Sequence, residues 1–138
     1  INSGRIEMQG GPALHNLKAL FQQIYDQGHR LVNHAWRPRS EFLELCAEMD
    51  ICLQSSFSET FNIVAADTAS MGVPIIGSRE IPWCSVFFCA DPTDSRDIVS
   101  CLDLALTYPK INNWLMKKCI REYSRSTLKT WLHWINSL

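Results

Sequence analysis

Apolar positions along this chain fall into two kinds of segment. Short apolar runs bounded by turn residues predict strands, and apolar positions spaced by three and four residues predict helices. The expected strands are residues 30–34, 51–53, 74–76 and 86–89, after the tail of an earlier strand at 1–3. Helices are expected between these strands, with one or two more after residue 108. This alternation predicts an α/β fold, a Rossmann-like parallel sheet with helices on both faces.

Several helix boundaries carry sequence signals. Gly10-Gly11 and Pro12 open a helix that Gly28 is expected to end, and Ser40 is the expected N-cap of a helix reaching about Glu48. Asp91-Pro92-Thr93-Asp94 breaks the chain before a helix with Ile98, Leu102, Ala105 and Leu106 on its apolar face.

The window from residue 55 to 78 carries the most chemistry. A polar loop ending at Glu59 leads into a helix with one acid, Asp67, and that helix is expected to stop at Gly72. Counted along a helical rise of ~1.5 Å per residue, the two carboxylates lie roughly 12 Å apart, a span that suits two parts of one elongated ligand. An alternative interpretation is a capped amphipathic helix with two solvated acids.

The start of this helix predicts an anion site. Thr60 is the expected N-cap, and the free backbone N–H groups of Phe61, Asn62 and Ile63 would point out of the helix end. These donors and the positive end of the helix dipole favour phosphate. With the two acids, they describe a pocket for a nucleotide sugar.

This stretch resembles the signature of retaining GT-B glycosyltransferases of the family-four type, in which a Glu is followed by seven residues and a second acid. The matching residues here are Glu59, Phe61, Asp67, Ala69, Gly72, Val73 and Pro74. The likeness extends upstream through Ala35-Trp36-Arg37-Pro38 and Met49-Asp50-Ile51, so it covers at least residues 30–78. Two departures stand out: Asp67 replaces the usual Glu, and Asn62 replaces a Gly.

The resemblance implies the donor-binding half of a GT-B fold with its first strand truncated. The N-terminal acceptor domain of the same protein would be missing, so the fragment alone is expected to lack turnover. The intact enzyme would transfer a hexose from a nucleotide-diphosphate sugar with retained configuration and without a bound metal or cofactor. The family usually supplies an Arg or Lys pair for the diphosphate. Here Arg5, Arg37 and Arg79 lie near strand ends, but none matches that motif.

The resemblance also implies a role for each candidate residue. Glu59, the expected catalytic residue, would contact hydroxyls of the donor sugar, and Asp67 would bind the ribose. The remaining expected donor-binding residues are Ser58, Thr60, Phe61, Asn62 and Ile63 around the phosphates, and Trp36 and Arg37 near the base. Residues 78–81 are a further candidate near the sugar. Each has a structural alternative, with Glu59 and Asp67 as surface acids and Trp36 in the core.

Composition fits one domain of ordinary globular type, with 138 residues, 46% hydrophobic and 20% charged. The six cysteines form no CxxC pair and most lie in apolar runs, so buried free thiols are expected. The four histidines anchor no metal motif, and we expect no metal site. No signal peptide or membrane-spanning run is visible, which favours a cytoplasmic location.

Charge divides the chain into an expected core, residues 1–108, and a C-terminal helical segment, residues 109–138. The second part holds six Lys or Arg and one Glu, together with Trp114, Tyr123, Trp131 and Trp134. It predicts either packing against a neighbouring domain or peripheral contact with anionic lipid or an acidic partner. No nucleic-acid motif accompanies the charge. The alternative function is therefore a non-catalytic α/β interaction module that uses this Trp-rich basic segment.

Overall fold

The structure, a computed structural model, describes residues 11–137, with side chains from His15 onward. It divides into two units, Ile1–Phe42 and Leu43–Leu138, which are described separately. The expected strand tail at residues 1–3, Arg5 and Gly10 lie outside the described residues.

The first unit begins with helix α2, Gly11–Gln23, which has Pro12 in its first turn as expected. A short 3-10 helix, η1 (Tyr25–Gln27), follows it. Gly28 ends this 3-10 helix at a φ of +86°, in the left-handed region where glycine lacks the Cβ penalty. Gly28 therefore stops η1, and the expectation that it ends the first long helix is wrong.

The predicted strand at residues 30–34 is absent from the described structure. Only His34 forms an isolated bridge, and residues 29–38 are otherwise irregular. The next helix, α3, spans Arg39–Ala47, so Ser40 lies inside it and is not its N-cap.

The second unit is built around two parallel strands, β1 (Cys52–Gln54) and β2 (Ile75–Gly77). Their register pairs Cys52 with Ile75, and Gly77 forms a further parallel bridge with Cys89. The protein is therefore α/β, although its sheet is smaller than predicted. The expected strand at 86–89 is instead a 3-10 helix, η2 (Val86–Phe88), that ends at the bridge residue.

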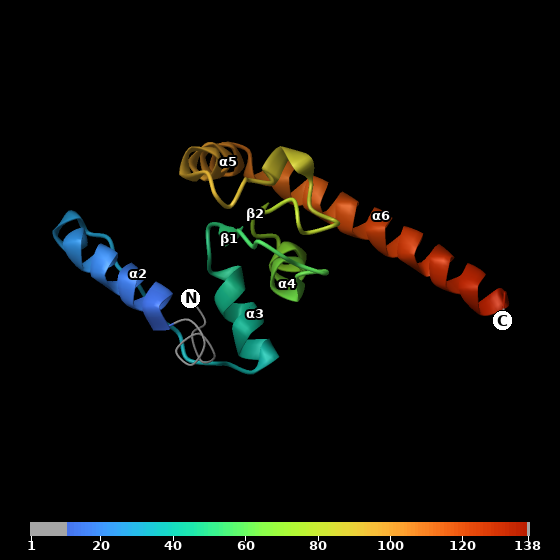
Figure 1. The fold of residues 1–138 in the computed structure, drawn as a ribbon, viewed down its shortest axis with the longest axis horizontal. Helices are drawn as coiled ribbons and strands as arrows, with labels where there is room; N and C mark the ends of the chain where they lie inside the picture. Colours follow the sequence, from blue (N-terminus) through green and yellow to red (C-terminus); the bar gives the residue numbers. More distant parts are fainter. Residues whose placement is uncertain (1–10, 138) are drawn as a thin grey trace. The chain divides into compact units, whose positions relative to one another are not determined.

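Three helices cover this sheet. The strands lie between α4 (Ile63–Met71) and α5 (Ser95–Thr107), which pack on opposite sides of them (Figure 1). The C-terminal segment is one helix, α6 (Pro109–Asn136), whose first half packs on α4, α5 and β2. Gly72 ends α4 in the left-handed region, at the residue that the sequence predicts.

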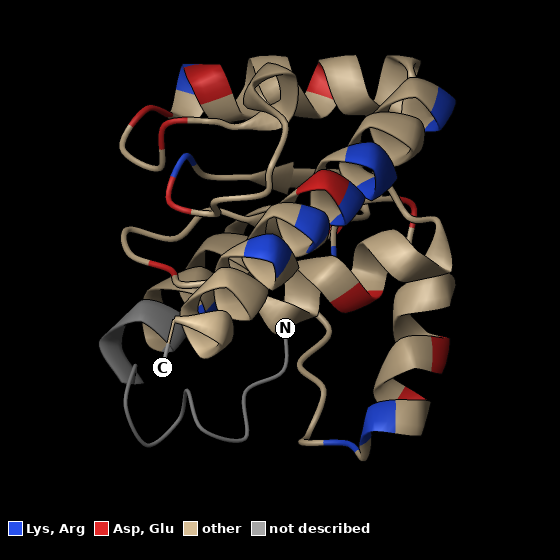
Figure 2. Ribbon diagram, turned by 90° about the vertical axis from the view of Figure 1, so that its right-hand side faces the viewer, with Lys and Arg blue, Asp and Glu red and all other residues tan. Residues whose placement is uncertain are grey.

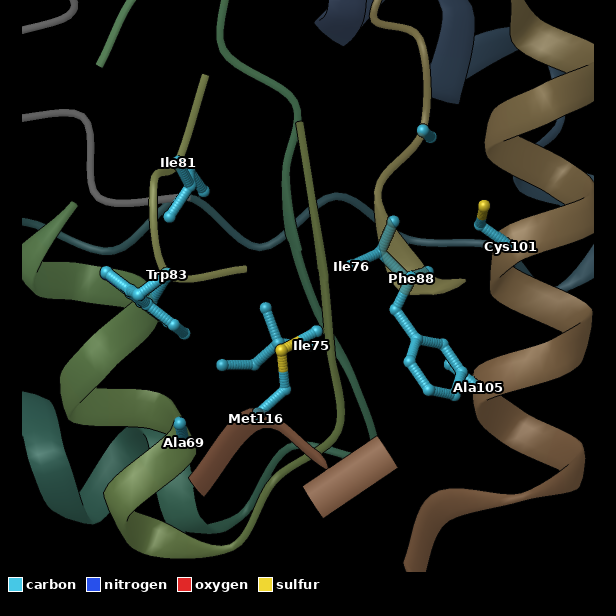
Figure 3. Close-up of a cluster of buried hydrophobic side chains, with 11 residues drawn as sticks. Ala69, Ile75, Ile76, Ile81, Trp83, Phe88, Cys101, Ala105 and Met116 are labelled. Carbon is cyan, nitrogen blue, oxygen red and sulfur yellow. The ribbon is translucent and has the colours of Figure 1, made fainter. Parts of the chain in front are cut away.

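The core lies around β2. Ile75 and Ile76 are fully buried, and Trp83, Phe88 and Met116 close around them from the loop, η2 and α6 (Figure 3). Burying one side chain of this size contributes roughly 1.5–3 kcal/mol, so this cluster stabilises the position of β2 in the unit.

A buried asparagine stands beside β2 where another strand would otherwise pair. Asn112 of α6 accepts a hydrogen bond from Ile75 N and donates one to Ile75 O, both at 2.8 Å. The side chain thereby satisfies both backbone groups of Ile75.

No helix within residues 11–137 is long and apolar enough to cross a membrane. The six cysteines are free thiols, and Cys46, Cys89 and Cys101 are buried, as expected.

Candidate functional site

The carboxyl ends of the two strands and of the bridge residue define one edge of the sheet. Gln54 ends β1, Gly77 ends β2, and Cys89 pairs with Gly77. Because these segments run parallel, the loops that follow them meet at the same edge. Ligands of open α/β sheets bind at such an edge, and both features described next lie there.

A hydrogen-bonded cluster connects β1 with the start of α4. Glu59 Oε1 accepts hydrogen bonds from Ser56 Oγ and from Asn62 Nδ2, both at 3.0 Å. Asn62 Nδ2 also donates to Gln54 Oε1 at 3.2 Å. The half-buried Glu59 is thus held in a fixed position at the sheet edge. Within the described residues its Oε2 has no partner and can accept a hydrogen bond from a ligand.

Asn62 is the N-cap of α4, which corrects the expectation that Thr60 has this role. Its Oδ1 accepts a hydrogen bond from Ala65 N at 2.9 Å, and its φ is +58°. Among non-glycine residues, asparagine is one of the few that adopt this left-handed conformation readily. The Thr60 assignment failed because Asn both outranks Thr as a cap and tolerates the turn.

The helix start is open to solvent. Ala65 N and Ala66 N donate hydrogen bonds to the side chain and the backbone carbonyl of Asn62. The N–H groups of Ile63 and Val64 have no acceptor among the described residues. The Ile63 side chain is 67% exposed. The two available N–H groups lie at the positive end of the α4 dipole, so an anion can reach them. Thr60 and Phe61 precede the helix, and their N–H groups are not part of its first turn.

Aromatic packing fixes the direction in which α4 starts. Phe61 lies against Trp83 and Tyr123, with ring centroids 6.0 Å apart in both pairs. Trp83 Nε1 donates a hydrogen bond to Phe61 O. Phe61 therefore anchors the helix start rather than lining a ligand site.

Asp67 lies on the outward face of α4. Asp67 comes four residues after Ile63 and four before Met71, and both of these side chains are exposed. Ala65, Thr68 and Ala69 lie on the other side of the helix and face the core. The helical rise does not give the spacing of Glu59 and Asp67, because α4 begins at Ile63 and Glu59 precedes it. Only the four residues from Ile63 to Asp67 follow the helical rise, which is about 6 Å.

A cavity of about 300 Å³ opens at the same edge. Its walls come from the loops after all three segments, and its lining residues are Phe57, Ser78, Arg79, Glu80, Ala90, Asp91, Pro92 and Thr93. Of the expected loop 78–81, residues 78–80 line this cavity, whereas Ile81 is buried in the core. Among the described residues, neither Glu59 nor Asp67 lines it.

The cavity combines polar groups with one aromatic side chain. Ser78 is 0% exposed, and its Oγ has no hydrogen-bond partner within the described residues. Phe57 is 73% exposed at the cavity wall. A buried hydroxyl without a partner costs free energy, so a ligand polar group that reached Ser78 would recover it.

Arg79 and Asp91 both line this cavity, and the charge of Arg79 acts on the Asp91 carboxylate. Thr93 donates hydrogen bonds from its hydroxyl and backbone N–H to Asp91 Oδ1, at 2.6 and 2.8 Å. These bonds, and to a smaller extent the charge of Arg79, lower the pKa of Asp91 below its usual value. The cavity lining therefore combines one cation, Arg79, with two acidic residues, Glu80 and Asp91.

The remaining expected site residues are Ser58, Trp36 and Arg37. Ser58 is exposed, and Ser56 is the serine that contacts Glu59. Trp36 and Arg37 belong to the first unit. Trp36 is 69% exposed and not in the core, while Arg37 forms an ion pair with Glu41 at 3.9 Å.

Sequence reasoning missed two sets of residues. Gln54 and Ser56, the partners of Glu59 and Asn62, carry no motif. The cavity wall at Asp91-Pro92-Thr93 could have been found, because it follows a segment that was itself predicted as a strand and ligands collect at strand ends.

No group of metal-binding side chains occurs within residues 15–137. Searches against protein-family models, curated proteins and solved structures found no match to this chain.

Proposed function

We propose that this chain is the donor-binding half of a retaining glycosyltransferase with a GT-B, Rossmann-like fold. In the intact, cytoplasmic enzyme it would bind a nucleotide-diphosphate sugar and transfer the hexose with retention. The chain itself is proposed to bind the nucleotide of this donor.

The observation that carries the proposal is the conformation of Asn62. The family signature has Gly at this position, and Asn62 adopts a positive φ that glycine also adopts freely. The departure from the signature thus preserves the backbone turn. It leaves the N–H groups of Ile63 and Val64 directed out of the helix end, where the signature places the phosphates.

The charged residues at the sheet edge support distinct roles. Glu59, held by Ser56 and Asn62, would accept hydrogen bonds from sugar hydroxyls. Asp67, on the outward face of the same helix, would accept those of the ribose. A hydrogen bond to a charged group of this kind contributes roughly 1.5–3 kcal/mol.

Arg79 is our candidate for stabilising the diphosphate leaving group. It is the cation that lines the cavity at the sheet edge. As the glycosidic bond breaks, negative charge grows on the diphosphate, and a preorganised cation and backbone donors lower the barrier. Trp36 and Arg37 remain the proposed contacts of the base.

Calorimetric titration with UDP, GDP and ADP tests this proposal. One nucleotide should bind, and Asp67→Asn should weaken its binding roughly tenfold, corresponding to the loss of one charge-assisted hydrogen bond. Asp103→Asn, which changes an exposed acid on α5, is the matched control and should bind as the unmodified protein does. Absence of heat with all three nucleotides would contradict the proposal.

A second candidate function is a non-catalytic interaction module, and the end of α6 favours it. Trp131 and Trp134 are both more than half exposed, and their rings meet edge to face at 5.6 Å. Leu128, Leu132 and Ile135 are also exposed there. Lys and Arg residues are spaced along the same helix (Figure 2). Such a surface suits a protein partner or an anionic lipid surface.

Sedimentation analysis distinguishes the second candidate. Deleting all of residues 109–138 would remove Asn112 and Met116 from the core, so the sharper variant is Trp131→Ala with Trp134→Ala. If the module self-associates, this pair of substitutions should shift the protein to monomer. Lys129→Ala, on the same helix, is the control for a general change of the surface.

A further inference from the structure

Sulfur-containing side chains from β2's neighbouring loop, from the residue after η2 and from α6 occur close together in the second unit. Cys84 Sγ lies 3.9 Å from Met116 Sδ and 3.9 Å from the Phe88 carbonyl oxygen. Cys89 directly follows Phe88 and bridges Gly77, and Cys119 is one turn along α6 from Met116.

The glycine of β2 brings two of these thiols together. A Cβ added to Gly77 would lie 2.7 Å from Cys84 Sγ, so this thiol occupies the space directly over the Gly77 backbone. Gly77 pairs in parallel with Cys89. Paired residues of neighbouring strands direct their side chains to the same face of a sheet, about 5 Å apart. Cys89 therefore points to the face on which the Cys84 thiol already sits.

The two thiols differ in acidity. The neighbouring Cys84 thiol lowers the pKa of Cys89, and the charge of Arg79 lowers it further, while burial opposes both effects. The same interaction between the two thiols, together with burial, raises the pKa of Cys84. Cys89 is thus the thiol that ionises first, and the thiolate is the reactive form of cysteine.

We propose that Cys84 and Cys89 form a reversible redox pair, a modification site that hydroperoxides convert to a disulfide. The proposal is independent of any glycosyltransferase activity, since it uses only the sheet register and the position of the two sulfurs.

The oxidation proceeds in two steps. The Cys89 thiolate attacks one oxygen of hydrogen peroxide, the O–O bond breaks, and the protein gains a sulfenic acid while hydroxide leaves. The Cys84 sulfur then attacks the sulfenic sulfur, an S–S bond forms, and hydroxide leaves with the Cys84 proton as water. Overall, two thiols and one peroxide give one disulfide and two waters, and a dithiol reductant reverses the change.

The disulfide would join two walls of the cavity at their base. Cys84 lies at the end of the loop that starts with Ser78, and Cys89 precedes the wall formed by Ala90 to Thr93. The cross-link closes a short loop around η2, so it holds the two walls together.

Mass spectrometry of the full chain tests the proposal. Trypsin cleaves after Arg79 and Arg96, which leaves both cysteines on the peptide of residues 80–96. After mild peroxide treatment of the folded protein, removal of the peroxide and alkylation of the unfolded chain, this peptide should have lost two hydrogen atoms and carry no alkyl group. Chymotrypsin, which cuts within η2, should release two fragments that remain joined until a dithiol is added.

Internal and mutational controls make the result specific. Cys101, a buried thiol of α5, should still be alkylated when the 80–96 peptide is oxidised. In Cys84→Ser, Cys89 should stop at the sulfenic acid, which dimedone traps. The proposal is overturned if Cys84 and Cys89 remain alkylated when Cys101 is already oxidised, or if Cys84 pairs with Cys119.

Discussion

Asn62 does more than any other single residue to shape the candidate site. Its Oδ1 caps α4, its Nδ2 holds Glu59 and Gln54, and its backbone makes the left-handed turn between them. One side chain therefore sets both the direction of the helix N–H groups and the position of the acid.

Substitution at Asn62 separates the turn from the cap. Asn62→Ala loses the cap and strains the left-handed turn, so we expect it to lower the free energy of unfolding by roughly 1–3 kcal/mol. Asn62→Gly also loses the side-chain bonds but relieves the strain, and its loss should be smaller. Urea unfolding of both variants measures the difference. Equal losses would mean that the backbone conformation contributes nothing.

The Asp91 side chain makes a pH-dependent contribution to the stability of the folded protein. Its pKa in the folded protein is lowered, mainly by the hydrogen bonds from Thr93. A lowered folded pKa means stability that is present above the unfolded pKa and lost as the pH falls through the folded value. Thermal melts from pH 6 to pH 2 should therefore show Asp91→Asn less stable than the unmodified protein at pH 6. The difference in melting temperature between the two proteins should disappear near pH 2. A difference that does not change with pH would show that the Asp91 carboxylate has no lowered pKa in the folded protein.

Among the elements, β2 depends on a helix side chain instead of a further strand. Asn112 of α6 forms hydrogen bonds with both the N–H and the C=O of Ile75. Met116, one turn later in α6, packs in the same core (Figure 3). The C-terminal helix is thus part of the structure that holds the strand, whatever its exposed end binds.

Removing this side chain tests the dependence. Asn112→Ala leaves two buried backbone groups of Ile75 without partners, and we expect a loss of roughly 2–4 kcal/mol in the free energy of unfolding. Asn136→Ala, exposed near the end of the same helix, should change stability by less than about 0.5 kcal/mol. Similar effects of the two substitutions would show that water or another donor replaces Asn112.

The helices and strands also show how much of the fold can be predicted from the sequence alone. Gly72 and β2 were predictable, because a helix-ending glycine and a buried apolar run carry local signals. The runs at 30–34 and 86–89 look the same locally, yet only Cys89 pairs with β2, since a strand exists only where a neighbour accepts its hydrogen bonds. Likewise Glu59 was predictable, but its partners Gln54 and Ser56 depend on how β1 meets α4.

At the scale of the whole chain, the second unit brings three carboxyl-terminal loops to one edge of its sheet. The start of α4, the cavity at Ser78 and the thiol pair beneath it all lie along that edge. This arrangement requires only a short parallel pair and one bridge residue, because α4, α5, α6 and the segment from Ile81 to Ala90 supply the rest of the core.

The most direct test of the account is an amide NMR titration with UDP, GDP and ADP. If the α4 start binds the diphosphate, the N–H resonances of Ile63 and Val64 should shift most with one nucleotide, and those on the solvent face of α5 should not. Asn62→Ala should abolish the shifts. Saturating nucleotide that leaves Ile63 and Val64 unchanged, or that shifts only residues elsewhere, would contradict the account.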